Sequence, residues 1–233
     1  MKIDVLDDKG YVRLVDHMGG DLSVVNSARV SYAKESKELS PNDIKLIQFL
    51  AREGHLSPFR HAVIQLEFYA PLMVARQHWK YVVGSDHTMD AWNEASRRYI
   101  TIDVENYIPN PMDWRSKPEN SKQGSGAPVD ESIGQEATDR LLRQIEQGLK
   151  DYEWALANHI APEQARLLIP SAYGMYTAYY WTASLQSVCH FLNQRLANDS
   201  QYEIQAYAQA VYKLVHPLFP VSIDQLLKDS QSL

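Results

Sequence analysis

Apolar residues recur along the chain at two spacings, which are those of a helix and of a strand. In the segment 41–54 they lie three or four positions apart, as they do on one face of a helix. Ser40 is suited to cap this helix, Pro41 to its first position and Gly54 to its end. In the segment 62–68 apolar and polar residues alternate instead, which predicts a strand with one buried face.

The same two patterns predict elements along the rest of the chain. Helices are expected at 22–30, 71–81, 130–158, 184–196, 202–215 and 223–227, and strands at 3–6, 11–15 and 173–182. The strands do not alternate one by one with the helices, as they would in a parallel α/β fold. We therefore expect an α+β fold, with an antiparallel sheet flanked by helices.

One long segment, 109–128, follows neither pattern and is rich in Pro, Ser, Asn, Gly and Lys. Too little chain lies on either side of it to form two independent cores. We therefore interpret it as a mobile loop, of the kind that often serves as a lid, inside one domain that spans residues 1–233.

The composition argues against several classes of protein. A net charge of −6 disfavours a surface for duplex nucleic acid, which needs a basic stripe to neutralise phosphates. No apolar run approaches the ~18 residues that span a bilayer, and the first residues are too polar for a secretory signal. The one cysteine, Cys189, cannot form an intrachain disulfide, which fits a reducing compartment. We expect a soluble cytoplasmic protein (in the host cytoplasm if a phage encodes it) without nucleic acid or membrane partners.

The segment 93–99 carries residues suited to bind a nucleotide. If it is extended, Glu94, Ser96 and Arg98 fall at every second position and point the same way. Arginine holds a phosphate with two parallel hydrogen bonds, while hydroxyl and carboxylate groups bind polar atoms of the ring and sugar. The alternative is the solvent-exposed face of a half-buried strand, and the pattern alone leaves both interpretations open.

Arg195 is the second candidate. On the helix predicted at 184–196 it lies at the edge of an apolar stripe, where an unpaired guanidinium would be costly. An internal salt bridge, a side chain that extends to solvent or an anionic ligand would each satisfy it. Cys189 lies in the middle of the same stripe, where burial would suppress its thiolate form, so we expect it to be structural.

Four histidines, His55, His61, His78 and His87, invite a metal interpretation, but their spacings match no helical pair or zinc-finger pattern. The glycines in the 109–128 loop follow no strand and precede no helix directly, so they do not form a phosphate-binding loop of the usual kind. We therefore expect no bound metal.

A series of short segments carries the most specific signal in the chain. In order they are Ala28-Arg29-Val30-Ser31, Gly54-His55-Leu56-Ser57-Pro58-Phe59-Arg60-His61, Ala70-Pro71-Leu72-Met73-Val74-Ala75-Arg76-Gln77, Asn93-Glu94-Ala95-Ser96-Arg97-Arg98-Tyr99, Ala165-Arg166, Ile169-Pro170, Tyr176-Thr177, Trp181-Thr182, Phe191-Leu192-Asn193-Gln194-Arg195 and Gln201-Tyr202-Glu203-Ile204-Gln205-Ala206-Tyr207. Each segment alone would be a weak signal, but so many in this order form a strong one. Together they resemble the flavin-dependent thymidylate synthases.

This resemblance implies a fold and a reaction. The fold would be that of the thymidylate synthase-complementing proteins, an α+β subunit assembled as a homotetramer with FAD and dUMP sites shared between subunits. The reaction would be the reductive methylation of dUMP to dTMP. In it, 5,10-methylenetetrahydrofolate donates the carbon, and FAD reduced by NADPH supplies the hydride. No cysteine attacks the uracil ring in this chemistry, which agrees with the structural role expected of Cys189.

The resemblance also implies which residues bind the ligands. The dUMP contacts would be Gln77, Glu94, Ser96, Arg97, Arg98, Arg166 and Arg195. Arg195 would be catalytic, since it would lie over the pyrimidine and favour loss of the N3 proton. The FAD contacts would be Ser57, Asp86, His87, Glu94, Ser184, Gln186 and His190.

The chain departs from the family in one signature, which reads Arg-His-Arg, then seven residues, then Ser. Counted back from Ser96, this chain has Asp86-His87-Thr88 there, and about six residues are inserted around 80–85. We hypothesise that Lys80, Arg76 or Arg97 replaces the missing arginines.

Three alternative functions remain. The chain could be a catalytically impaired homologue that binds nucleotide and flavin without turnover. It could instead be a cysteine-dependent thymidylate synthase that uses Cys189, or a metal hydrolase that uses the histidines.

Overall fold

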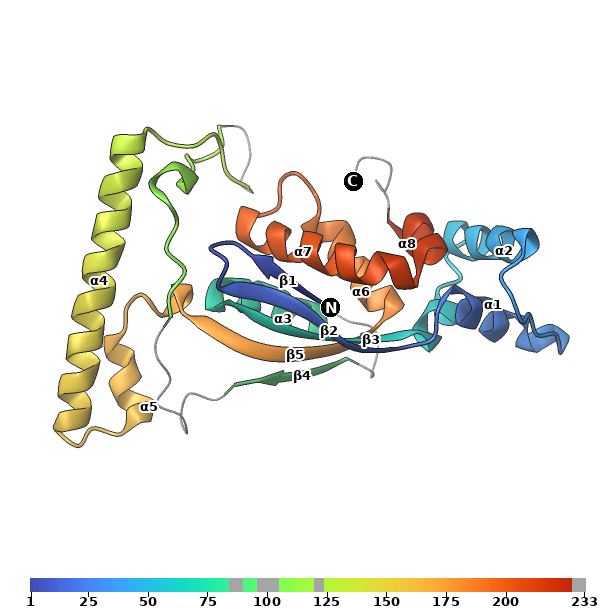
Figure 1. Ribbon diagram of the computed structural model, residues 1–233, viewed down its shortest axis with the longest axis horizontal. Helices are drawn as coiled ribbons and strands as arrows, with labels where there is room; N and C mark the ends of the chain where they lie inside the picture. The colour runs from blue at the N-terminus through green and yellow to red at the C-terminus, as the bar shows by residue number, and fades with distance from the viewer. Residues whose placement is uncertain (84–89, 96–104, 120–123, 228–233) are drawn as a thin grey trace.

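The structure is a computed structural model that describes residues 1–83, 90–95, 105–119 and 124–227 (Figure 1). Five strands form one sheet in the order β1-β2-β3-β5-β4, and all neighbouring strands are antiparallel. The strands are β1 (Lys2–Val5), β2 (Gly10–Met18), β3 (Val63–Pro71), β4 (Ala91–Glu94) and β5 (Tyr176–Ser184). The predicted α+β class and antiparallel sheet are confirmed.

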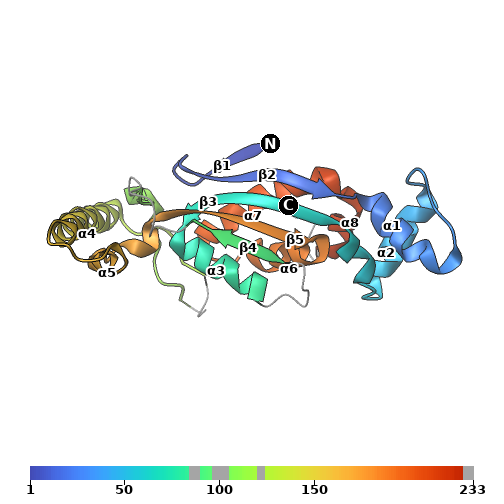
Figure 2. The same cartoon turned by 90° about the horizontal axis from the view of Figure 1, so that it is seen from below.

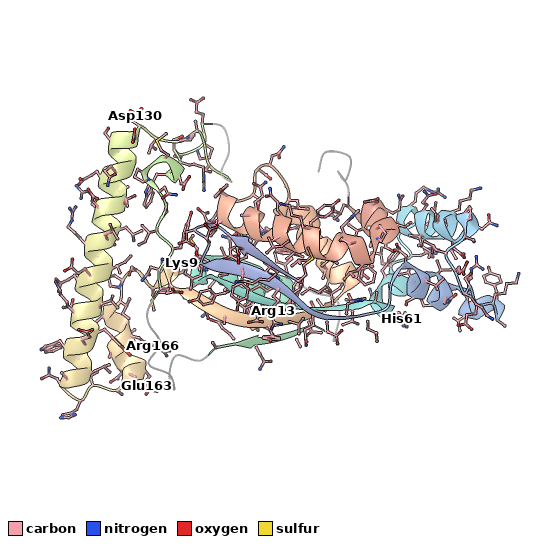
Figure 3. All side chains as sticks on the ribbon, viewed as in Figure 1. Lys9, Arg13, His61, Asp130, Glu163 and Arg166 are labelled. Atoms are coloured by element: carbon pink, nitrogen blue, oxygen red, sulfur yellow. The ribbon has the colours of Figure 1, made fainter. Side chains whose placement is uncertain are left out.

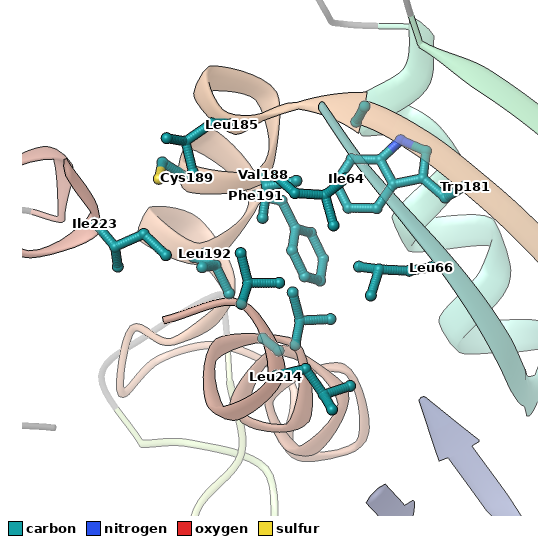
Figure 4. Close-up of a cluster of buried hydrophobic side chains, with 14 of the residues drawn as sticks. Ile64, Leu66, Trp181, Leu185, Val188, Cys189, Phe191, Leu192, Leu214 and Ile223 are labelled. Carbon is teal, nitrogen blue, oxygen red and sulfur yellow. The ribbon is translucent and has the colours of Figure 1, made fainter. Parts of the chain in front are cut away.

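Helices cover one face of this sheet. Figure 1 shows α6 (Leu185–Arg195), α7 (Tyr202–Val215) and α8 (Pro220–Leu226) above the strands. The alternation in β3 explains why, because every second residue from Ile64 to Ala70 is buried beneath them. In Figure 4, Ile64 and Trp181 of the sheet lie opposite Phe191 of α6. This contact is the centre of the apolar core.

The opposite face of the sheet is polar. Glu67 on β3 accepts hydrogen bonds from Tyr11 (2.8 Å) and from Nε of Arg13 (2.7 Å) on β2. Burial alone would raise the pKa of Glu67, but these hydrogen bonds hold it below its usual value. The same strands therefore present an apolar face to the helices and a hydrogen-bonded face away from them.

Four other helices stand at the two ends of the sheet, as Figure 2 shows. At one end lie α1 (Asp21–Arg29) and α2 (Pro41–Arg52), and at the other lie the long α4 (Glu131–Ala157) and the short α5 (Pro162–Ala165). None of the helices in the described ranges is long and apolar enough to cross a membrane.

The predicted start of α2 is confirmed in detail. The Ser40 hydroxyl accepts a hydrogen bond from the backbone N–H of Asp43 (3.3 Å), and the Asp43 carboxylate accepts one from the backbone N–H of Ser40 (2.8 Å). This reciprocal cap satisfies two backbone donors that the helix itself leaves unpaired. Arg29 adds an ion pair to Asp43 at 2.5 Å, which joins α1 to α2.

Two predictions of local structure were wrong. Pro71 does not open a helix but ends β3, where it pairs with Tyr176, and α3 (Leu72–Val83) begins one residue later. The strand predicted from residue 173 begins at Tyr176, because a 3-10 turn occupies Ala172–Gly174. In both cases a strand pairing, which local pattern does not reveal, sets the boundary.

The 109–128 segment has more structure than its composition predicts. It contains a 3-10 turn at Pro111–Asp113 and a bridge between Arg115 and Pro128. The indole N–H of Trp114 donates to Thr138 on α4 at 2.8 Å. The described part of the loop is thus attached to α4, and the mobility predicted for the loop stays a prediction.

His78 on α3 fixes this helix against the sheet. Its ring is 1% exposed and packs against five other rings, those of Phe68, Trp92, Tyr179, Trp181 and Phe191. Nδ1 lies 3.2 Å from the Tyr179 hydroxyl, and Nε2 has no hydrogen-bond partner within the described ranges. Burial lowers the pKa of His78 to about 3, so the ring is neutral and behaves as a core residue.

This burial predicts a pH dependence of stability. Unfolded His78 binds a proton below about pH 6.5, whereas folded His78 stays neutral down to about pH 3. Between these values stability therefore falls with falling pH, by about 1.4 kcal/mol per unit for this one proton. We expect His78→Phe to reduce the slope of the free energy of unfolding against pH by that amount. Urea unfolding between pH 4 and pH 7 measures this slope. The exposed His55 supplies the control, because His55→Phe makes the same substitution outside the core. Equal slopes in wild type and His78→Phe would contradict the interpretation.

Candidate active site

A cavity of about 320 Å³ opens beside the first turns of α3. Its walls come from α3, the end of β4, the chain after α5 and the start of β5. Most of the lining that the structure describes is apolar, and the charged side chains in this described lining are Arg76, Glu94 and Arg166. The cavity therefore brings together two residues predicted to bind dUMP, Glu94 and Arg166.

Glu94 is held by the sheet. It is the last residue of β4, where it pairs with Tyr179 of β5. The hydroxyl of Thr177, also on β5, donates to its carboxylate at 3.3 Å. Glu94 is nevertheless exposed, so the carboxylate can still accept hydrogen bonds from a ligand.

Arg166 is held by a turn that packs closely on α4. Its Nε donates to the backbone oxygen of Glu163 at 3.0 Å, while its side chain remains exposed (Figure 3). Gly148 on α4 permits the close packing, because a Cβ atom there would lie 3.0 Å from Pro170. The long helix thus supports the turn that presents this guanidinium.

Arg76 is the third charged group of the cavity. It is exposed on α3, and Lys80 follows one turn later, also exposed. Sequence comparison with the family suggested Arg76 only as a replacement for a missing arginine, and the cavity is the observation that favours it. Two guanidinium groups and one carboxylate suit an anionic ligand that also carries hydrogen-bond donors, as a nucleoside monophosphate does.

Arg195 lies elsewhere in the chain and is not among the residues that line this cavity. From the end of α6 its Nε donates to the Tyr81 hydroxyl at 2.7 Å, and its guanidinium lies over the Tyr81 ring. The Tyr81 hydroxyl in turn donates to Gln194 at 3.2 Å. Burial raises the pKa of Tyr81 despite the nearby positive charge, so the hydroxyl remains a donor.

Gln77 joins α3 to the start of α7. Its side-chain amide donates to Gln201, and Gln201 donates to Glu203 at 2.8 Å. Arg115, from the 109–128 loop, forms an ion pair with the same Glu203 at 3.0 Å. A continuous polar chain therefore connects this predicted dUMP contact with the loop.

Three of the residues predicted to bind FAD lie on exposed or half-buried surface. Gln186 and His190 are one turn apart on α6, and Ser57 is exposed at the start of the neighbouring 3-10 turn, Ser57–His61. Nε of Arg60, on this turn, donates to the Gln186 amide oxygen at 2.8 Å. The family-like segment around Arg60 contained this arginine, but nothing in the sequence singled it out. These side chains place several hydrogen-bonding groups at the surface beside α6.

Ser184 has a different environment. It is fully buried, and its hydroxyl caps α6 by accepting from the backbone N–H of Ser187 at 3.2 Å. It therefore positions the first turn of the helix that carries Gln186.

The other predicted contacts, Asp86, His87, Ser96, Arg97 and Arg98, lie outside the described residues. Within the described ranges, no group of three or more His, Cys, Asp or Glu side chains is arranged to hold a metal ion.

Comparisons with known proteins identify the family. The model of the family described as thymidylate synthase complementing protein matches residues 13–221. The flavin-dependent thymidylate synthase of Thermosipho africanus is 38% identical over 95% of this chain and 92% of its own length. One from Thermus thermophilus is 39% identical over 95% of this chain and 77% of its own.

Solved structures of a uridylate methylase are also similar to this chain. The UMP/dUMP methylase PolB from Streptomyces cacaoi, bound with 5-Br UMP, superposes with a TM-score of 0.79 at 26% identity and covers 95% of both chains. Its complex with 5-Br dUMP gives a TM-score of 0.79 at 28% identity over 96% of both chains. Since the family model spans most of the chain and the relatives exceed 30% identity over nearly all of it, this chain belongs to the flavin-dependent thymidylate synthases.

Proposed function

We propose that this chain methylates dUMP to dTMP, with 5,10-methylenetetrahydrofolate as the carbon donor and FAD reduced by NADPH as the hydride source. The observation that carries the proposal is the cavity in which Arg76, Glu94 and Arg166 meet, in a chain of this family. The names of the relatives support a flavin cofactor, and the PolB complexes support a uridylate substrate. We place the reaction in the cytoplasm, which the single reduced cysteine supports.

The charged groups divide the recognition of dUMP between them. The guanidinium groups of Arg166 and Arg76 hold the phosphate, because each can donate two parallel hydrogen bonds to its oxygens. Glu94 accepts from an N–H or hydroxyl group of the nucleoside, and Thr177 keeps its carboxylate oriented. By the resemblance to the family, Ser96, Arg97 and Arg98 are further dUMP contacts in this proposal.

Arg195 activates the pyrimidine in this proposal. Its hydrogen bond to Tyr81 uses Nε, which leaves the two terminal nitrogens to face a substrate. A positive charge next to the ring favours loss of the N3 proton and increases electron density at C5. Gln77 positions the ring from α3.

Two copies of the chain complete one site. Arg195 and the cavity of Glu94 belong to different parts of the single chain, yet both act on one uridylate in the proposed reaction. We therefore place Arg195 of one copy over the cavity of another, in a homotetramer.

The flavin contacts are Ser57, Gln186 and His190, with Glu94 between the two ligands. Ser184 contributes by capping α6, and Asp86 and His87 complete the set. Bound reduced FAD supplies the hydride that converts the transferred one-carbon unit into a methyl group. The protein binds and orients the reactants and excludes water from the site.

Cys189 takes no part in the reaction. It is 2% exposed on α6 within the apolar core, where burial raises the pKa of its thiol far above the ordinary value (Figure 4). A cysteine-dependent route would need a thiolate that reaches C6 of the uracil, and this side chain faces Leu185 and the core instead.

The Cys189→Ala variant separates the two routes. We expect kcat within about twofold of wild type, because the thiol touches no reactant, and a loss of stability of about 1 kcal/mol from the smaller side chain. The measurement is the rate of dTMP formation, corrected for folded protein by circular dichroism. Loss of turnover in a folded, FAD-loaded variant would establish the cysteine-dependent route instead.

Removal of Arg166 tests the uridylate site. We expect Arg166→Ala to weaken dUMP binding about 10- to 100-fold, because a charge-assisted pair with the phosphate is lost, while FAD still binds. Titration calorimetry measures the affinity of the variant for dUMP, and dUMP-dependent oxidation of reduced flavin measures its turnover. Arg140→Ala removes a similarly exposed arginine on α4 and serves as the matched control.

Either of two results would count against this assignment. Unchanged dUMP affinity in Arg166→Ala would remove Arg166 from the site. A wild-type protein that binds both ligands but never oxidises flavin in response to dUMP would be the catalytically impaired homologue.

A further inference from the structure

Arg195 is held by a neutral group instead of a carboxylate. Two other partly buried arginines, Arg29 and Arg115, each form an ion pair with a carboxylate. Arg195 is partly buried as well, but it takes part in none of the ion pairs between described residues. Its Nε donates instead to the hydroxyl of Tyr81 at 2.7 Å. The partner that orients this guanidinium is therefore a phenol.

The Tyr81 hydroxyl is itself oriented. It donates to the side-chain oxygen of Gln194 at 3.2 Å, so its lone pairs remain for Arg195. Tyr81 is 6% exposed, and its ring packs edge-on against Phe191, with centroids 5.2 Å apart, and against His190 at 5.7 Å. Because the ring is fixed by these contacts, the hydroxyl holds the guanidinium in one place.

A neutral partner leaves the positive charge of Arg195 available to a ligand. A carboxylate at ion-pair distance would offset much of the effect of the guanidinium on a neighbouring substrate atom. A phenol orients the same group without cancelling its charge. Burial raises the pKa of Tyr81, so the phenol stays neutral. The contact uses Nε and neither of the terminal nitrogens of Arg195.

We propose that Tyr81 is a positioning residue for the reaction, which holds the guanidinium of Arg195 as an uncompensated charge at the pyrimidine. The inference rests on the proposed function, in which Arg195 favours loss of the N3 proton. Tyr81 is buried and acts only through Arg195. The positive charge stabilises the pyrimidine more in the transition state, where the ring gains negative charge, than in the neutral bound substrate. Its position therefore affects kcat more than KM.

Tyr81→Phe tests this inference, because it removes the hydroxyl and keeps the ring. We expect oxidation of bound reduced flavin, at saturating dUMP and methylenetetrahydrofolate, to slow about 10- to 100-fold, since a hydrogen bond to a charged group is lost. The half-saturating dUMP concentration is expected to stay within about threefold of wild type, because the proposed phosphate contacts of Arg76 and Arg166 are unchanged. Stopped-flow absorbance of the flavin measures both quantities.

A double-mutant cycle shows whether Tyr81 acts through Arg195. Arg195→Met removes the charge and the donor, and methionine is flexible enough to fill the space. We expect Tyr81→Phe to slow the Arg195→Met variant by less than about twofold, whereas a structural role alone would slow both backgrounds equally. Tyr207→Phe is the matched control, because it removes another buried hydroxyl, which donates to the backbone oxygen of Tyr69 at 2.8 Å. We expect its flavin oxidation to stay within about twofold of wild type.

The outcomes separate this inference from the proposed function. A wild-type rate in folded Tyr81→Phe, beside a slow Arg195→Met, would overturn the inference and leave the proposed function intact. Equal slowing in both backgrounds, or the same slowing in Tyr207→Phe, would also overturn the inference alone. A wild-type rate in Arg195→Met, or a wild-type protein that never oxidises flavin in response to dUMP, would overturn the proposed role of Arg195 as well.

Gln194→Leu replaces Tyr81→Phe if the latter does not fold. This change removes the acceptor of the Tyr81 proton at an exposed position, so the hydroxyl is no longer directed toward Arg195. We expect slower flavin oxidation with an unchanged half-saturating dUMP concentration, and again no further effect in Arg195→Met. A wild-type rate in Gln194→Leu would overturn the inference in that case.

Discussion

The packing of α3 against the sheet is the constraint on which the rest of the structure depends. The ring of His78 is enclosed by aromatic side chains from β3, β4, β5 and α6, so a single buried residue fixes the helix against three strands and another helix. Aromatic contacts of this kind are directional as well as apolar, and they define the rotation of the helix about its axis. Because that rotation is fixed, the polar residues of α3 can each serve a different neighbour.

Three such residues show the consequence. Arg76 lines the cavity that contains Glu94 and Arg166, Gln77 reaches Gln201 at the start of α7, and Tyr81 binds Arg195 at the end of α6. Arg76 precedes Gln77 by one position and Tyr81 by five, so it points well away from both, whereas Gln77 and Tyr81 lie one turn apart on the same flank. Arg195 contacts a different flank of α3 from the one that carries Arg76. This separation of the two arginines explains why the proposed uridylate site needs two copies of the chain.

The apolar pattern was sufficient to predict most of the elements, because the core-facing residues of β3 and α6 follow the two regular spacings closely. It was insufficient where long-range pairing decides a boundary, as at Pro71, which pairs with Tyr176 more than a hundred residues away. The four-residue α5 is shorter than any period that a pattern can reveal. The order of the strands also depends on such pairings, and no local pattern encodes it.

The candidate site, like the fold, was only partly predictable from the sequence. Family-like segments indicated Glu94 and Arg166, but their meeting in one cavity is a consequence of how the turn after α5 packs on α4 through Gly148. Arg60 was not predicted, since a single arginine carries no periodic signal, and its contact depends on Gln186, which lies far along the chain.

The central claim is that these charged groups hold a uridylate against a flavin. The visible absorption spectrum of the purified protein, recorded before and after addition of dUMP, tests it most directly. The account predicts a yellow protein, or one that takes up added FAD, whose flavin band shifts saturably with dUMP because the nucleotide enters the environment of the flavin. A colourless protein that takes up no FAD, or a flavin spectrum that dUMP leaves unchanged at saturation, would contradict it.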